Sequence, residues 1–158
     1  APAAGVAPRL GRHYFGSKRE LFMASVQLPV DPAVFFSQVF GGDPERLSER
    51  GARALISSLE DADTRRAALA IMRAAATEPQ AAEVIRAVLT TRVLSPLVSH
   101  LQTDHPELRA TMVATQFVGL AMARYVVGIE PLASAPPEQV VRALTPVIDH
   151  FLNDDWTD

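Results

Sequence analysis

Side chains that can bind an anionic partner gather near the start of the sequence. Arg9, Arg12 and His13 fall within one short segment, and Tyr14 and Lys18 follow closely. Arginine at the start of a helix can read guanine O6 and N7 in a DNA major groove, while tyrosine and lysine can hold phosphates. The segment therefore predicts a DNA-contacting surface, and charge alone leaves a solvated basic terminus as the alternative.

The distribution of charge separates this segment from the rest of the chain. The 158 residues carry a formal net charge of −3. Residues 1–19 contain four basic and no acidic side chains, whereas the remaining residues contain 11 basic and 18 acidic side chains, a net charge of −7. A basic head on an acidic body predicts an anionic partner for the head only.

No spacing in the sequence indicates catalysis. A nucleophile elbow, a phosphate-binding loop, a dinucleotide fingerprint and an HExxH motif are all absent, and so is cysteine. His100, Asp104 and His105 cluster in sequence, but their spacing matches no zinc template, so capping and solvation are the better interpretation. We predict a protein that is not an enzyme and has neither a metal site nor a cofactor.

The elements that must position the basic head are helices. Proline follows aspartate at Asp31-Pro32 and Asp43-Pro44, where aspartate can cap a helix and proline suits its first turn. Runs typical of strands are absent, and strong helix formers dominate. We predict an all-α fold with helices over residues 7–13, 17–27, 32–40, 44–59, 64–77, 79–101 with a bend near Pro96, 106–129, and 137–152 with a kink at Pro146.

The last two predicted helices carry more apolar surface than one small core needs. Residues 112–129 have Arg124 as their only charge, so they should be covered by protein on more than one side. The final helix has one apolar stripe, formed by Val140, Leu144, Val147, Ile148 and Phe151. The surplus predicts a homodimer, with packing inside one monomer as the alternative. An arginine and two other polar residues in residues 112–129 argue against a membrane span.

Residues 4–22 contain a recognisable pattern. Its fixed positions are Ala4-Gly5-Val6, Tyr14-Phe15, Gly16-Ser17-Lys18 and Leu21-Phe22. This pattern closely resembles the DNA-binding signature of TetR-type (TetR/AcrR) bacterial transcriptional regulators, with Ala7 in place of the usual serine. Gly11 and Arg12 depart from it, since the family usually has an aliphatic residue and an aromatic or histidine there. Residues 29–152 are similar, less specifically, to the C-terminal regulatory domain of a subgroup of these regulators.

The resemblance implies a helix-turn-helix remnant, lacking the first part of its DNA-binding domain, followed by a TetR-type C-terminal helical bundle. The implied domains are residues 1–28, the recognition and linker helices, and residues 29–153, for ligand binding and dimerisation. The implied function is a cytoplasmic, ligand-responsive repressor that binds operator DNA and a small-molecule effector. A helical dimeric sensor without DNA binding is the alternative, motivated by Gly11 and the missing first part. The implied DNA contacts are Ala7, Arg9, Arg12, His13, Tyr14 and Lys18.

The resemblance also implies a ligand cavity inside the helical body and a dimer interface on its last two long helices. Polar groups within apolar helices, with neighbouring wall residues, are the candidate ligand contacts: Met72, Arg73, Thr77, Gln116, Met122 and Tyr125. The candidate interface residues are Phe117, Leu120, Arg124, Val140, Leu144, Val147 and Phe151. For Arg73 and Arg124, an arginine paired in the core or at an interface is an equally good interpretation, and the two methionines also suit core packing.

Overall fold

Helices make up the regular structure of residues 26–156, the part of the chain that the computed structural model describes. No strand occurs among these residues, and the all-α prediction is confirmed. The elements in chain order are α2 (Pro32–Phe40), the 3₁₀ turn η1 (Pro44–Arg46), α3 (Leu47–Glu60), α4 (Ala62–Thr77), α5 (Pro79–Leu89), the π-helical η2 (Thr90–Leu94), α6 (Ser95–His100), α7 (Pro106–Leu120), the π-helical η3 (Ala121–Val127) and α8 (Pro137–Asn153). The helix predicted over residues 7–13 and most of that over residues 17–27 lie outside the described residues.

Aspartate caps begin several of these helices. Asp31 Oδ1 accepts a hydrogen bond from the backbone N–H of Ala33 at 2.9 Å, which satisfies one of the free donors at the start of α2. Asp43 caps η1 in the same way, as predicted. Asp61 Oδ2 accepts from Thr64 N–H at 2.8 Å, so α4 begins two residues earlier than its predicted start at residue 64.

Two long helical segments widen into π-helix instead of staying α-helical. In the predicted helix over residues 79–101, the change falls at η2, just before Pro96. Proline has no N–H for the preceding turn and its ring crowds the carbonyl four residues back. The Ser95 N–H bonds to the Thr90 carbonyl instead, closing a wider turn. Gly128, at φ 69°, ends η3 in the left-handed conformation that glycine adopts without strain.

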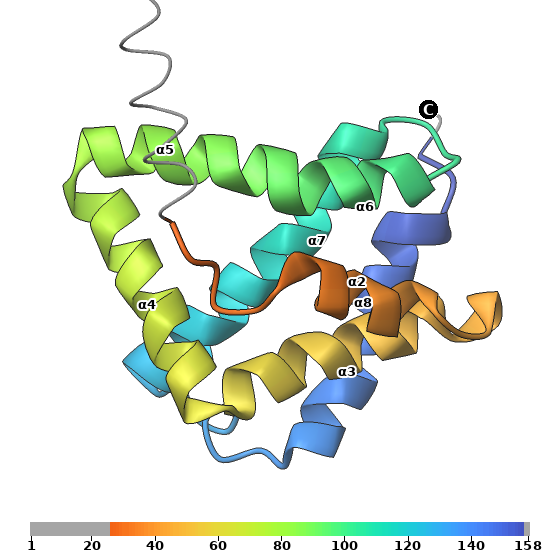
Figure 1. Cartoon of the computed structure of the whole chain (residues 1–158). Helices are drawn as coiled ribbons and strands as arrows, with labels where there is room; N and C mark the ends of the chain where they lie inside the picture. The colour runs from red at the N-terminus through yellow and green to blue at the C-terminus, as the bar shows by residue number, and fades with distance from the viewer. Residues whose placement is uncertain (1–25, 157–158) are drawn as a thin grey trace, which may run out of the picture.

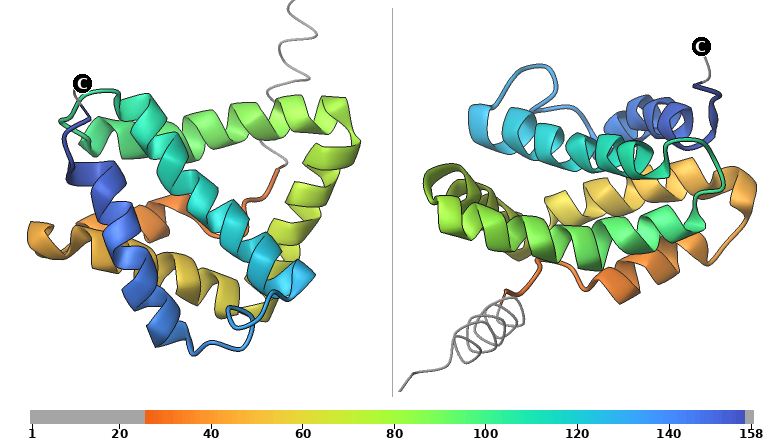
Figure 2. Two further views of the ribbon diagram at one scale, coloured as in Figure 1. Left: turned by 180° about the vertical axis from the view of Figure 1, so that it is seen from behind. Right: turned by 90° about the horizontal axis from the view of Figure 1, so that it is seen from above.

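The helices form three layers. In Figure 1, α4, the α5–α6 stretch and α3 outline three sides of a frame, with α2 in front of it and α7 and α8 behind. The two further views in Figure 2 agree, and the view from above separates α2 from α7 by the layer that contains α3 and α5. The α2 helix thus lies on one side of the frame, and α7 and α8 lie on the other.

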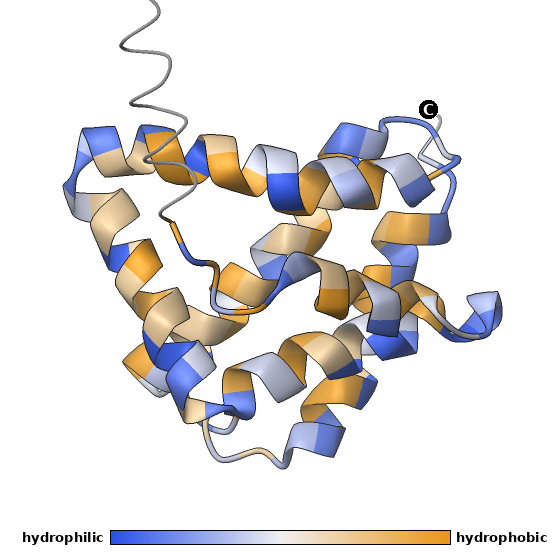
Figure 3. Cartoon of the chain, viewed as in Figure 1, coloured by the Kyte–Doolittle hydropathy of each residue, from blue (hydrophilic) through white to orange (hydrophobic). Residues whose placement is uncertain are grey.

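The main hydrophobic core joins α3 to α8. It contains Ala52, Ile56, Val140, Val141, Leu144, Ile148 and Leu152, all buried. In Figure 3, hydrophilic residues gather where α3 meets α4, whereas hydrophobic residues occupy much of α2, α7 and α8. The apolar stripe predicted on α8 therefore packs largely against α3 of the same chain, and α8 stays helical through Pro146.

Candidate functional site: an apolar cavity between α2 and α7

A cavity of about 230 Å³ lies between α2 and α7, bounded by α3, the α5–α6 stretch and α8. The elements that bound it can be followed in Figure 2. The lining residues are Leu28, Pro29, Val30, Pro32, Phe35, Phe36, Val39, Phe40, Leu47, Gly51, Leu55, Ser58, Leu89, Val93, Leu94, Leu97, Val113, Ala114, Phe117, Val118, Ile148 and Leu152. Almost all of them are hydrocarbon or aromatic, so the cavity suits the apolar part of a small molecule.

Helical periodicity explains the contribution of α3. Leu47, Gly51, Leu55 and Ser58 recur at intervals of four, four and three residues, which places them on one face of the helix. The adjoining face of α3, with Ile56 among its buried residues, packs against α8. One helix therefore contributes to the core with one face and to the cavity with the other.

Aromatic contacts form the wall on the side of α2. The rings of Phe35 and Phe36 meet edge to face with centroids 5.5 Å apart, and Phe36 stacks on Phe40 at 5.7 Å. Phe40 in turn stacks on His100 at the end of α6, with ring centroids 3.8 Å apart. This series of rings ties α2 to α6 and gives the cavity a wall of aromatic surface.

Ser58 is the one polar side chain that the described part of the chain contributes to the lining. Its hydroxyl donates a hydrogen bond to the Ala54 carbonyl of the preceding turn at 2.8 Å. The proton is therefore engaged, and the oxygen keeps lone pairs that can accept a hydrogen bond from a ligand. Among residues 26–156, no charged side chain lines the cavity.

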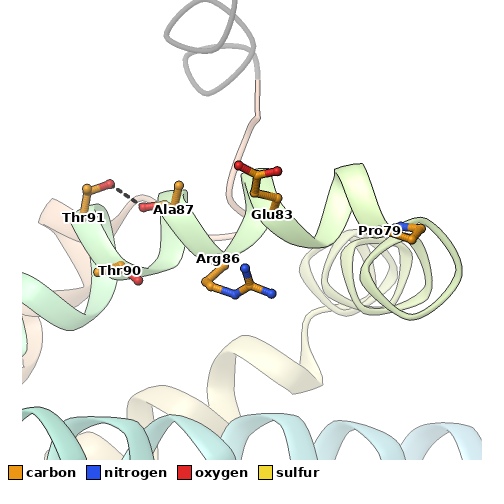
Figure 4. Close-up of a pocket in the computed structure, with 6 residues that line it drawn as sticks. All are labelled: Pro79, Glu83, Arg86, Ala87, Thr90 and Thr91. Atoms are coloured by element: carbon orange, nitrogen blue, oxygen red, sulfur yellow. Dashed lines mark hydrogen bonds between the residues drawn. The ribbon is translucent and has the colours of Figure 1, made fainter. Parts of the chain in front are cut away.

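A second hollow lies along α5. Its residues are Pro79, Glu83, Arg86, Ala87, Thr90 and Thr91, drawn in Figure 4. All six belong to one continuous helical stretch, and the Thr91 hydroxyl donates to the Ala87 carbonyl at 2.9 Å within that stretch. Because the lining among the described residues comes from a single helical stretch, this hollow is a weaker candidate than the cavity.

None of the six residues predicted as ligand contacts lines the cavity. Arg73 and Thr77 are exposed on α4, where the Thr77 hydroxyl donates to the Arg73 carbonyl at 2.9 Å. The Gln116 amide donates to the Met112 carbonyl one turn earlier, at 3.3 Å. Met72 is half-buried on α4 and Met122 is exposed on η3. The structure therefore places all six predicted contacts outside the lining of the cavity, in separate groups on α4 and on the α7–η3 stretch.

Tyr125 and Arg124 belong to a cluster that joins η3 to the end of α3. Arg124 is 8% exposed, and its Nη2 lies 3.1 Å from Glu60 Oε1. Its Nη1 donates to the Leu132 carbonyl, the Tyr125 hydroxyl donates to Glu60, and the guanidinium of Arg65 lies over the tyrosine ring. Arg124 is thus an arginine paired inside the chain, which was the alternative interpretation of its sequence position.

The pKa values of this cluster follow from the same contacts. Burial by itself would raise the pKa of Glu60, but hydrogen bonds from Tyr125 and Arg124 outweigh it and leave the pKa below the ordinary value. Burial and the hydrogen bond to Glu60 raise the pKa of Tyr125. At neutral pH the cluster therefore contains an ionised carboxylate, a neutral phenol and a guanidinium, an arrangement that fixes η3 on α3.

The residues predicted for a dimer interface differ in their surroundings: some lie in the core, one lines the cavity and one is exposed. Val140 and Leu144, 5% and 6% exposed, lie in the core of the chain itself and pack against α3, and their contact with a partner stays a prediction. Leu120 packs against the same core, and Phe117 lines the cavity. Val147 is exposed, whereas Phe151 is half-buried beside Trp156.

An exposed apolar surface does exist on α7 and η3. Val118, Met122 and Val126 recur every four residues on one face, 48%, 40% and 52% exposed. The sequence predicted surplus apolar surface on this helix but named Met122 as a ligand contact. The six predicted DNA contacts, Ala7 to Lys18, lie outside the described residues.

No metal site accompanies the cavity. Within residues 26–156, no three side chains of His, Asp or Glu lie close enough together to hold a metal ion. His100 stacks on Phe40, and Asp104 pairs with Arg109 at 2.6 Å. The two residues therefore have structural contacts of their own.

Residues 26–156 thus form a helical body with an apolar cavity, the kind of space in which proteins hold small molecules. Residues 45–152 match the family described as "Tetracyclin repressor-like, C-terminal domain". The chain belongs to this family of TetR-type transcriptional regulators. It is also similar to the crystal structure of a TetR-family regulator from Streptomyces coelicolor A3, with a TM-score of 0.61 and 28% sequence identity over 89% of this chain and 94% of that chain. A comparison with curated proteins gives no match.

Proposed function

We propose that the protein is a ligand-responsive, DNA-binding repressor that works as a cytoplasmic homodimer. Residues 1–28 belong to its DNA-binding head, and residues 29–153 bind the effector and form the dimer. The DNA contacts in this proposal are Ala7, Arg9, Arg12, His13, Tyr14 and Lys18. This proposal rests on the family of the chain and on the place of the cavity.

The proposed ligand response is supported by the part of the cavity wall that Leu28, Pro29 and Val30 form. These residues line the cavity and precede α2, on the stretch of chain that leads to residues 1–25. The Val26 carbonyl accepts a hydrogen bond from Arg92 on η2 at 3.3 Å, which ties this stretch to the opposite wall. A ligand in the cavity therefore touches the connection to the head, and by linkage DNA and ligand alter each other's affinity by the same factor.

The exposed face of Val118, Met122 and Val126 supports a dimer. By length and composition alone, the helical stretch Pro106–Val127 could cross a membrane. Arg124 lies within it and is paired with Glu60 of the same body, an arrangement that suits a protein neighbour better than lipid. We therefore assign the exposed face to contact with a second copy.

A salt titration of DNA binding tests the proposal. The intact protein should bind the DNA upstream of its own gene, with a logarithmic affinity that falls steeply with the logarithm of salt concentration. Arg9→Ala should weaken binding and reduce the magnitude of this slope by about 1. Arg66→Ala is the matched control, because Arg66 is an exposed arginine on α4 that pairs with Asp63. A dimer without salt-dependent DNA binding would instead support the sensor that does not read DNA.

A further inference from the structure

Gly51 lies on the face of α3 that lines the cavity and contributes no side chain there. It stands between Leu47 and Leu55, one turn from each. A Cβ atom added at Gly51 would meet nothing within 4 Å. By contrast, a Cβ at Gly41 would lie 2.4 Å from the Ser37 carbonyl oxygen, and Gly128 has a positive φ. Neither steric crowding nor backbone conformation therefore requires glycine at position 51.

Glycine inside a helix lowers helix stability, because its backbone loses more conformational freedom on folding than that of other residues. At position 51 the missing side chain leaves open volume at the cavity wall, and the lower helix stability is the cost of that volume. We propose that Gly51 keeps the cavity open for an uncharged, largely hydrocarbon effector of about ten non-hydrogen atoms with at most one hydrogen-bond donor. The proposal rests on the ligand response proposed above and adds the chemical class of the ligand.

The lining that residues 26–156 provide contains no charged side chain, and this decides against an ionic ligand. The nearby ionic cluster of Glu60 and Arg124 is paired within itself and does not line the cavity. A carboxylate or ammonium moved into an apolar space without a partner loses its hydration and gains nothing in return. The ligand is therefore neutral at the pH at which it binds.

The volume sets the size of the ligand. An engineered apolar cavity of about 150 Å³ holds benzene, which has six heavy atoms. A cavity of about 230 Å³ in this protein, filled to similar density, takes about ten. Phe35, Phe36 and Phe117 supply ring surface, which favours a ligand with an aromatic ring packed edge to face or offset.

Ser58 sets the hydrogen bonding of the ligand. Because its proton is donated to the Ala54 carbonyl, its oxygen acts as an acceptor. A ligand hydroxyl placed on the α3 side can donate to it. A phenol or an alcohol attached to an apolar skeleton satisfies the charge, the size and the single polar contact together.

Three naphthyl compounds test the class of ligand. Binding of naphthalene, 2-naphthol and 2-naphthoate to the full chain would be measured by calorimetry at neutral pH, where the last is an anion. We expect one site per chain for the two neutral compounds, with 2-naphthol binding about 2- to 10-fold more tightly through Ser58. Binding of 2-naphthoate should be weaker than that of 2-naphthol by more than about 100-fold. The Ser58→Ala variant should remove the advantage of 2-naphthol and leave naphthalene unaffected.

Variants at Gly51 test the site. Gly51→Phe should fill the cavity and abolish binding of the neutral compounds, while far-UV circular dichroism shows the helical fold retained. Gly51→Ala is the matched control, since one methyl group leaves most of the volume and binding should persist. Should Gly51→Phe fail to fold, Ala114→Phe, which enters from α7, takes its place.

The outcomes separate this inference from the proposed function. Equal or tighter binding of 2-naphthoate overturns the neutral class but leaves a ligand-responsive cavity standing. Absence of binding by both neutral compounds, or full binding by Gly51→Phe, overturns the inference at this site. If 2-naphthol binds in a Gly51-dependent way and DNA affinity does not change, the ligand class is supported and the proposed coupling to DNA fails.

Discussion

Arg109 is the polar side chain most deeply buried among residues 26–156, with 0% exposure. Its Nε donates to the Asp104 carbonyl at 2.7 Å, and its Nη2 donates to Asp104 Oδ1 at 2.6 Å and to the Asp154 carbonyl at 2.7 Å. Its Nη1 donates to the Phe151 carbonyl at 2.9 Å, and its guanidinium lies 4.1 Å from the ring centroid of Trp156. One side chain therefore joins the start of α7 to the end of α8.

Truncation of Arg109 to alanine should be strongly destabilising. The change leaves a carboxylate and three carbonyl groups without their donor, and each orphaned buried group costs about 1–3 kcal/mol. Asp104 is 30% exposed and Asp154 is exposed, so water recovers part of this loss, and we expect about 3–5 kcal/mol in total. For a domain of this size, that loss lowers the melting temperature by about 10–15 °C.

Two probes measure the effect. Urea unfolding followed by far-UV circular dichroism gives the free energy, and fluorescence of Trp156, the single tryptophan, reports on the α7–α8 contact. Arg109→Lys should lie between Arg109→Ala and the wild type, because one ammonium cannot reach all four acceptors. Arg66→Ala, at an exposed arginine, is the control and should match the wild type. A loss of less than about 1 kcal/mol in Arg109→Ala would refute the assigned role.

Three further predictions concern acid stability, helix capping and assembly. Hydrogen bonds hold the folded-state pKa of Glu60 below 4.5, so the ionised carboxylate stabilises the fold fully above that pH and loses this effect as pH falls through the lower pKa. Glu60→Gln should therefore be less stable than the wild type at pH 7, and its free energy of unfolding in urea should fall less steeply with acid. Asp61→Asn should keep the cap on α4 and Asp61→Ala should lose it, so only the alanine variant should show reduced helicity and a lower melting temperature at pH 7. Met122→Glu should shift the proposed dimer toward monomer in analytical ultracentrifugation, whereas Ala70→Glu, at an exposed position on α4, should not.

The helix boundaries were predictable because their signals are local. Proline after aspartate marked the starts of α2 and η1, and the caps at Asp31 and Asp43 depend on atoms only two residues apart. The change from α-helix to π-helix at η2 was harder to predict. Proline at position 96 indicated a disturbance of the ladder, but whether the helix bends or widens depends on how the flanking turns pack.

The cavity was harder to predict because it is an empty space between packed helices, which no local sequence motif marks directly. Polar residues within apolar helices were predicted to contact the ligand. In the structure, however, the Thr77 hydroxyl donates its hydrogen bond within α4, and Arg124 pairs with Glu60. The signal that does mark the cavity is Gly51, a small residue in register with Leu47 and Leu55 on one helix face. Likewise, an apolar stripe does not reveal whether its cover comes from the same chain, as it does for Leu144, or from a second copy.

The position of α7 links the two proposed sites. Ala114 and Phe117 line the cavity, whereas Met122 lies on the exposed face that we assign to the dimer, and Val118 belongs to both surfaces. A ligand that pushes on Phe117 therefore acts on the same rigid element that meets the partner, while Leu28–Val30 carries its effect toward the head. Because packed helices move as units, we expect a cavity ligand to change the DNA affinity through both routes. A variant that disrupts the dimer should then reduce this response without abolishing ligand binding.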